Sequence, residues 1–184
     1  MRPVLVCLLA LTMAGCAPDG SRIHYTHYGS YSGSIAHYGA RNGEMALAVF
    51  GNPTGASNAV FAAAVADALQ GTHVNHDVVF VPTDPPPMDG YRTVAVFGGT
   101  TQQDICGSNP IAPATPVPGT PGGLGAAYCY EGDVLSFVSA RHQPLAGPDD
   151  PELRRLLRWV GRELFPPENP EFVRECDIFP ALCR

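Results

Sequence analysis

The chain has 184 residues, 45% of them hydrophobic, with 20 Gly and 19 Pro. This length is typical of one globular domain that buries a sizeable core without a metal or a partner subunit. All 11 basic residues are arginine, which excludes catalysis by lysine in a Schiff base, a Walker motif or a Ser-Lys dyad. The formal net charge of -6 argues against nucleic acid as a partner, because duplex binding needs a basic face.

The N-terminus has the pattern of an export signal. Arg2 precedes an apolar run over 4–11 that is too short to span a bilayer. Residues Met13-Ala14-Gly15-Cys16 then resemble the bacterial lipobox, with Met in the position that Leu usually occupies. The resemblance implies a signal peptide over 1–15, removed before Cys16, which then carries diacylglycerol and an N-linked acyl chain such as palmitate. Three acyl chains anchor a protein stably to a membrane.

One alternative to lipidation stays open, and the residue after Cys16 bears on the location of the protein. The alternative is an ordinary secretory signal that leaves Cys16 as a free thiol. Ala17 follows Cys16 in place of the Asp that resembles an inner-membrane retention signal, so the predicted location is the periplasmic face of the bacterial outer membrane.

The remaining cysteines fit an oxidising compartment. Cys106, Cys129, Cys176 and Cys183 are an even number, and we expect two disulfides. Three connectivities are open, and loop closure favours the local pairs Cys106 with Cys129 and Cys176 with Cys183. The spacings lack the close pairs typical of zinc sites, so no metal or other cofactor is predicted.

Residues 16–43 are predicted to be a flexible tether. They are rich in His, Tyr, Gly and Ser and nearly devoid of aliphatic side chains, so little apolar surface is available to offset the entropy of ordering. Residues 44–184 are then expected to form a single periplasmic domain.

The predicted domain alternates apolar runs with turn signals. In chain order, we expect a strand over 45–50, a helix over 60–69 capped by Ser57 or Asn58, strands over 77–81 and 91–97, a proline-rich excursion over 107–125, strands over 126–130 and 134–139 joined by a turn over 131–133, and a helix over 150–164 capped by Asp150. The fold class is α/β (α+β). It comprises a small mixed sheet of about five strands in the order β-α-β-β-β-β-α, stapled by disulfides, with two helices on one face.

Several segments carry a family resemblance. They are Arg41-Asn42-Gly43-Glu44, Gly51-Asn52-Pro53, Cys106, the hairpin over 126–133 and Leu164-Phe165-Pro166-Pro167. Together they resemble a family of uncharacterised proteobacterial outer-membrane lipoproteins with an N-terminal lipobox. The resemblance implies an envelope lipoprotein and transfers no activity. At the level of the fold, the chain is also similar to the α/β domains of lipoproteins that activate peptidoglycan synthases or assemble secretion pores.

Few residues suggest catalysis, and no catalytic residue is assigned. The segment Gly29-Ser30-Tyr31-Ser32-Gly33 has glycines at the spacing of a nucleophile elbow, but Tyr occupies its centre. His73, His76 and Asp77 are candidate metal ligands, but their spacing matches no rigid motif, and the favoured interpretation is that these histidines are exposed loop residues.

The predicted C-terminal helix carries a stripe of arginines opposite its leucine face: Arg154, Arg155, Arg158 and Arg162. Guanidinium groups bind oxyanions bidentately, so this stripe is the candidate surface for an anionic lipid, cell-wall component or acidic envelope protein. Its alternative is a solvated face balanced by Glu152 and Glu163. Trp159, the only tryptophan, falls at the margin of the apolar stripe, and we expect it to be buried at the edge of the core. The alternative is that Trp159 is an exposed anchor for a partner.

The sequence therefore predicts a non-enzymatic, lipid-anchored envelope protein with an interaction or assembly role at the outer membrane. The alternative is a periplasmic metal-binding protein or hydrolase that uses His73, His76 and Asp77. The oligomeric state is left open.

Overall fold

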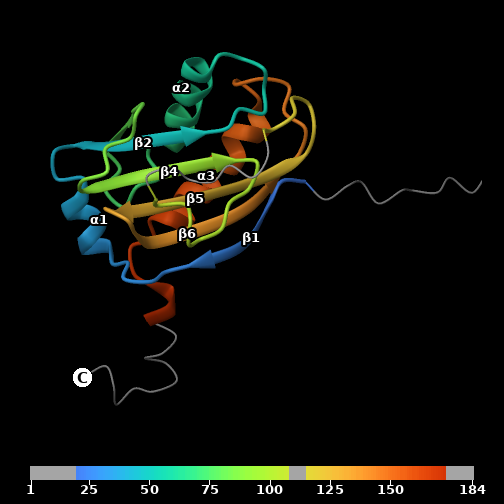
Figure 1. Ribbon diagram of the computed structural model, residues 1–184. Coiled ribbons are helices and arrows are strands. Elements are labelled where there is room, and N and C mark those ends of the chain that lie inside the picture. Colours follow the sequence, from blue (N-terminus) through green and yellow to red (C-terminus); the bar gives the residue numbers. More distant parts are fainter. Residues whose placement is uncertain (1–19, 108–114, 173–184) are drawn as a thin grey trace, which may run out of the picture.

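The computed structural model describes residues 20–107 and 115–172 (Figure 1). The predicted signal peptide, Cys16, Cys176 and Cys183 lie outside these residues. The described part folds as one mixed sheet with helices, which confirms the predicted α/β class.

A six-stranded sheet forms the centre of the domain, in the order β1-β6-β5-β4-β2-β3 (Figure 1). Its strands are β1 (Arg22–His27), β2 (Glu44–Phe50), β3 (Val79–Pro82), β4 (Tyr91–Phe97), β5 (Gly122–Tyr130) and β6 (Asp133–His142). The strand β2 runs parallel to β3 and β4, and the remaining neighbours are antiparallel. The β5–β6 hairpin closes through a two-residue turn in which Glu131 has φ of 52°, beside Gly132.

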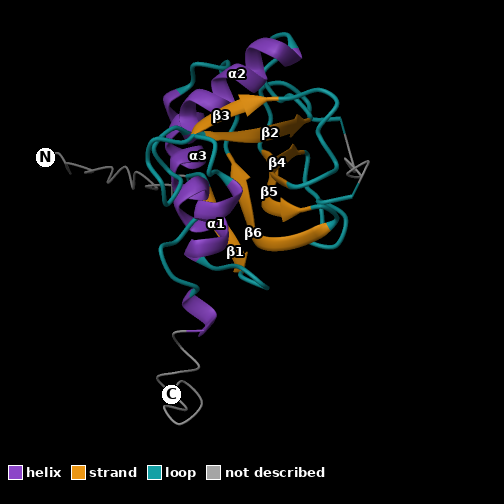
Figure 2. Ribbon diagram, turned by 90° about the vertical axis from the view of Figure 1, so that its left-hand side faces the viewer, coloured by secondary structure: helices purple, strands orange, loops and turns teal. Residues whose placement is uncertain are grey.

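Three helices cover one face of the sheet, as Figure 2 shows. They are α1 (Gly33–Gly39), α2 (Asn58–Leu69) and α3 (Pro151–Leu164). The predicted caps are present: the Ser57 side chain accepts from the Val60 amide, and the Asp150 side chain accepts from the Glu152 amide with Pro151 at the start of α3. Helices on this face bury alternate strand residues such as Leu47, Ala95 and Phe97.

The opposite face is covered by loops. Val94, Val96 and Phe137 form a second, smaller core there, together with Ile105 and the two sulfur-bearing residues of the Cys106–Cys129 disulfide. Both faces of β4 are therefore buried, which explains the apolar run over 94–97 in its second half. The predicted local pair Cys106–Cys129 is confirmed. This disulfide ties the loop that follows β4 to β5.

The predicted flexible tether is wrong for residues 22–39, which form β1 and α1. Strand β1 hydrogen-bonds along β6 and adds the sixth strand to the five expected. Tyr28 and Tyr31 are 5% and 3% exposed, and the Tyr31 hydroxyl donates to the Pro166 carbonyl over 2.6 Å. The prediction failed because it counted aliphatic side chains, whereas tyrosines supply the buried surface here.

Candidate functional site

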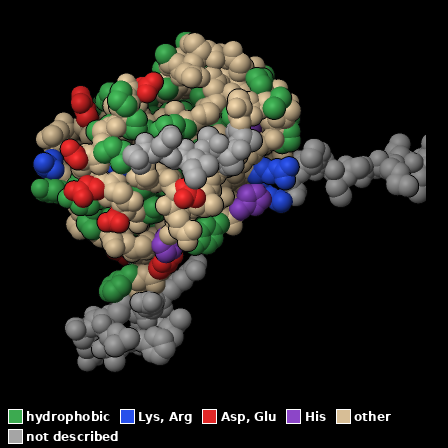
Figure 3. All heavy atoms as spheres, viewed as in Figure 1, with side chains coloured by type: hydrophobic (Ala, Val, Ile, Leu, Met, Phe, Trp, Pro, Cys, Tyr) green, Lys and Arg blue, Asp and Glu red, His purple; other side chains and the backbone are tan. Residues whose placement is uncertain are grey.

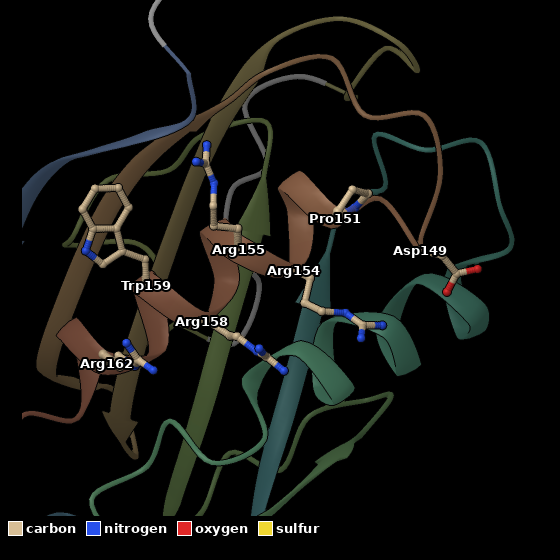
Figure 4. Close-up of a pocket in the computed structure, with 7 residues that line it drawn as sticks. All are labelled: Asp149, Pro151, Arg154, Arg155, Arg158, Trp159 and Arg162. Atoms are coloured by element: carbon tan, nitrogen blue, oxygen red, sulfur yellow. The ribbon is translucent and has the colours of Figure 1, made fainter.

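Helix α3 turns a basic face away from the sheet. Its apolar residues Leu153, Leu156, Leu157, Val160 and Leu164 are all buried. The opposite side carries Arg154, Arg155, Arg158, Trp159 and Arg162, which are all exposed and which we call the α3 arginine face (Figure 4). The sequence predicted this stripe, and the structure brings its four arginines together.

Two of the four arginines have acidic partners. A guanidinium nitrogen of Arg154 lies 3.4 Å from the Asp67 carboxylate on α2. A guanidinium nitrogen of Arg155 lies 2.8 Å from the carboxylate of Glu152, one turn earlier on α3. The predicted alternative, a balanced solvated face, therefore describes the first half of the helix.

The second half of the helix differs. Within residues 20–107 and 115–172, Arg158 and Arg162 make no ion pair with a carboxylate. The neighbouring Glu163 carboxylate, which the sequence suggested as a counter-charge, accepts a hydrogen bond from the Tyr28 hydroxyl over 3.0 Å. Among the described residues, these two guanidinium groups therefore have no carboxylate counter-charge.

An open groove of about 740 Å³ lies along this face, with the Asp149 carboxylate at the end that Pro151 forms (Figure 4). Arg154 and Arg158 extend toward α2, whereas Arg155 and Trp159 extend to the other side of the helix. The groove is open to solvent, unlike the concave pockets that enclose most of a small ligand.

Trp159 is 50% exposed, so the prediction that it is buried is wrong. The core side of α3 is already filled by leucines, and Gly161 lies so close to α2 that an added Cβ would overlap the Thr72 side chain. This close approach of the two helices fixes the rotation of α3 about its axis and leaves Trp159 outside the core. A large exposed indole beside arginines is a typical component of interaction surfaces.

His73 is fully buried, in contrast to the exposed loop residue that the sequence suggested. Its ring packs against Phe165 at 4.6 Å between centroids, and its Nδ1 accepts a hydrogen bond from the Asn75 amide over 3.0 Å. Burial lowers the pKa of His73 from 6.5 to about 4, so the ring stays neutral near pH 7.

His76 and Asp77 are exposed, and His76 Nδ1 lies 3.0 Å from the Gly71 carbonyl oxygen. Among the residues that the structure describes, no group of three or more His, Cys, Asp or Glu side chains is placed to hold a metal ion. His73, His76 and Asp77 are therefore not brought together as the metal-binding hypothesis required.

The segment Gly29 to Gly33 has a structural role. Ser32 caps α1, and its side chain accepts from the Ile35 amide over 3.2 Å. Gly29 to Gly33 line a second groove with Pro167 and Phe172.

One contact at α3 was missed by sequence reasoning. The Ser21 amide donates to the Glu152 carboxylate over 3.1 Å, which places the beginning of the described chain beside the first turn of α3. The two residues are 131 positions apart, and no local pattern signals a contact of that range.

The fold and this face define a two-layer α/β domain with a basic, tryptophan-bearing helix on its outer side. No protein-family model and no curated protein matches the chain. Among solved structures, the chain is similar to the PelC dodecamer from Paraburkholderia phytofirmans, with 11% identity, 78% of this chain and 97% of that chain covered, and a TM-score of 0.42. A likeness of this degree carries no argument about function. No helix within the described residues has the length and apolar character needed to cross a membrane.

Proposed function

We propose that this protein is a non-enzymatic, lipid-anchored envelope protein that binds an anionic partner through the α3 arginine face. The observation that carries the proposal is the placement of Arg158 and Arg162, without carboxylate partners among the described residues, on the same exposed face of α3 as the half-exposed Trp159. Guanidinium groups in this state are free to form bidentate hydrogen bonds to phosphate or carboxylate oxygens.

The location in the proposal is the periplasmic face of the outer membrane, with lipid on Cys16. Three features support it: the lipobox-like Met13-Ala14-Gly15-Cys16, the Ala17 that follows, and the Cys106–Cys129 disulfide, since structural disulfides persist in oxidising compartments. The lipid acts as the membrane anchor, and the folded domain supplies the interaction.

Anchoring is tested with Cys16→Ala in cells. We expect the variant to leave the membrane pellet after a carbonate wash while the domain stays folded, because Cys16 lies outside the described fold. Retention of the variant in the washed pellet would contradict lipid anchoring.

Anion binding is tested by titrating the purified protein with inorganic pyrophosphate. Trp159 is the only tryptophan, so its fluorescence reports directly on the α3 arginine face. We expect a saturable change that is lost in Arg158→Ala/Arg162→Ala and kept in Arg41→Ala, an exposed arginine near α1. A response that survives in the double variant would remove this face as the binding site.

A further inference from the structure

The described chain begins at the α3 arginine face. Besides the bond from the Ser21 amide to Glu152, a Cβ placed on Gly20 would lie 3.4 Å from a guanidinium nitrogen of Arg155. Glu152 also accepts from that guanidinium over 2.8 Å, so Ser21, Glu152 and Arg155 form one cluster. Strand β1 then holds the following residues along the edge of the sheet (Figure 1).

This position makes the connection to Cys16 very short. Only four residue steps separate Cys16 from Gly20, and a fully extended chain covers roughly 14 Å over that distance. The tether expected from the sequence, residues 16–43, would have reached roughly 90 Å if fully extended. Because β1 and α1 are folded, a lipid on Cys16 holds the start of α3 close to the membrane surface.

The chemistry of the α3 arginine face suits a phospholipid surface. Arginines bind lipid phosphates, and tryptophan is enriched at the level of the headgroups, where its apolar ring and its N–H are both accommodated. Three carboxylates lie near the first half of the face, on Asp67, Asp149 and Glu152, and two of them pair with Arg154 and Arg155. Among the described residues, Arg158 and Arg162 are therefore the arginines of this face without a carboxylate partner, and both lie on the same face as Trp159.

Arginines also flank the beginning of the described chain on the other sheet face. Arg22 on β1 lies opposite Arg141 on β6, and both are exposed. Figure 3 shows basic side chains gathered at this point, whereas acidic side chains are spread over the rest of the visible face. Two further exposed arginines therefore lie near the beginning of the described chain, on the sheet face opposite α3.

We propose that the α3 arginine face docks on the phospholipid phosphates of the membrane that carries the Cys16 lipid, with Trp159 in the headgroup layer. This inference rests on the proposed lipid anchoring and names the anionic partner of the same site. Docking orients the domain: α3 lies along the membrane, and the loop-covered face of the sheet points away from it and is presented to other envelope components.

The test uses the mature lipidated protein in vesicles of phosphatidylethanolamine and phosphatidylglycerol with brominated acyl chains. Brominated lipid quenches tryptophan at short range, and Trp159 is the only tryptophan. We expect its emission to shift to shorter wavelength and to lose intensity. Added salt should partly reverse both effects, because it screens the attraction between arginine and phosphate.

The matched variants are Arg158→Ala and Arg41→Ala, which remove one exposed arginine each from α3 and from the end of α1. Each arginine near an anionic surface favours the docked orientation about fivefold, so Arg158→Ala should lower the docked-to-undocked ratio by about that factor. The change should be larger in Arg158→Ala/Arg162→Ala, and Arg41→Ala should behave as the unmodified protein. All variants should remain bound to vesicles through the lipid.

Two results would overturn the inference in distinguishable ways. In the first, the lipidated protein binds vesicles, but Trp159 keeps a water-like emission and is quenched by aqueous iodide. Lipid anchoring would then be supported, membrane docking would be wrong, and the α3 arginine face would be available to bind a protein partner. If mass spectrometry finds no lipid on Cys16, both the anchoring proposal and the docking that rests on it are wrong.

Discussion

At the scale of single residues, His73 and His142 are both buried histidines whose Nε2 has no hydrogen-bond partner among the described residues. Phe80 and Phe165 lie against the ring of His73. The neutral ring is tolerated because Nδ1 accepts the Asn75 amide, but a proton on Nδ1 would break that bond and place a charge in the core.

This environment predicts acid sensitivity. The pKa of His73 is lowered from 6.5 to about 4, so between these values the unfolded chain binds a proton that the folded protein does not. The stabilisation is fully present above pH 6.5 and is lost as the pH falls to 4, by about 3 kcal/mol. In His73→Phe, the fall in unfolding free energy over this range should be smaller by that amount, as measured by urea denaturation at several pH values.

His142 is also buried, and burial lowers its pKa, so it contributes a fall of the same sign in both proteins. The difference between the unmodified protein and His73→Phe isolates His73. His76→Gln, at an exposed position, is the control. Identical pH profiles for the unmodified protein and His73→Phe would show that His73 does not cause the acid sensitivity.

The exposure of Trp159 predicts that its side chain contributes little to the free energy of unfolding, unlike a core residue. Because its side chain is half-exposed, Trp159→Ala should change the unfolding free energy by no more than about 0.5 kcal/mol. Leu156→Ala, one turn away on the buried side, should lower it by about 2 to 5 kcal/mol. Urea denaturation followed by circular dichroism measures both, and equal losses in the two variants would show that Trp159 packs in the core.

At the scale of elements, the contact between α2 and α3 determines which side of α3 meets solvent. Gly161 is buried against Leu69, the last residue of α2, and against Thr72, which follows that helix. The absence of a side chain at Gly161 lets the two helices approach closely, and α3 is held with its leucines on the sheet and its arginines outside.

Gly161→Ala tests this contact. Alanine favours a helix over glycine by up to about 1 kcal/mol, but its Cβ would overlap the Thr72 side chain, and overpacking of this kind destabilises by about 1 to 3 kcal/mol. We expect a net loss of stability in thermal denaturation. Adding Thr72→Ala should make the double variant more stable than the sum of the two single effects, and strict additivity would contradict the proposed overlap.

At the scale of the whole molecule, the two cores on either side of the sheet are held differently. The helix-side core is large, whereas the loop-side core is small and includes the Cys106–Cys129 disulfide. Arg92, 1% exposed, donates to the Met88 and Cys106 carbonyls and links the loop before β4 to the loop after it. The loop layer therefore depends on a crosslink and on polar contacts as well as on apolar burial.

Removal of this disulfide should lower global stability. The bond joins residues separated by 23 positions, and closing a loop of that size in the unfolded chain contributes about 3 kcal/mol. We expect Cys106→Ala/Cys129→Ala to lose about that much in urea denaturation. Cys176→Ala/Cys183→Ala is the control, and a larger loss in the control than in the test variant would show that the principal crosslink lies elsewhere.

Local sequence patterns were sufficient to predict much of the secondary structure of this protein. The apolar runs, the caps at Ser57 and Asp150 and the spacing of leucines along α3 predicted strands β2 to β6 and helices α2 and α3, because each signal lies within a few residues of the element it defines. The same spacing placed the four arginines on one stripe. The sequence also favoured the Cys106–Cys129 pair over the alternatives, since a short loop closes at the smallest entropic cost.

Only the tertiary structure decided whether the N-terminal segment folds and which aromatic side chains are buried, because these features depend on contacts between distant parts of the chain. Strand β1 exists through pairing with β6, and Tyr28 and Tyr31 are buried by residues that follow α3 or end it. Whether Trp159 is buried depends on how closely Gly161 approaches Thr72, and the burial of His73 depends on Phe165. The bond from Ser21 to Glu152 brings the α3 arginine face beside the segment that leads from Cys16, over a separation in sequence that no periodicity encodes.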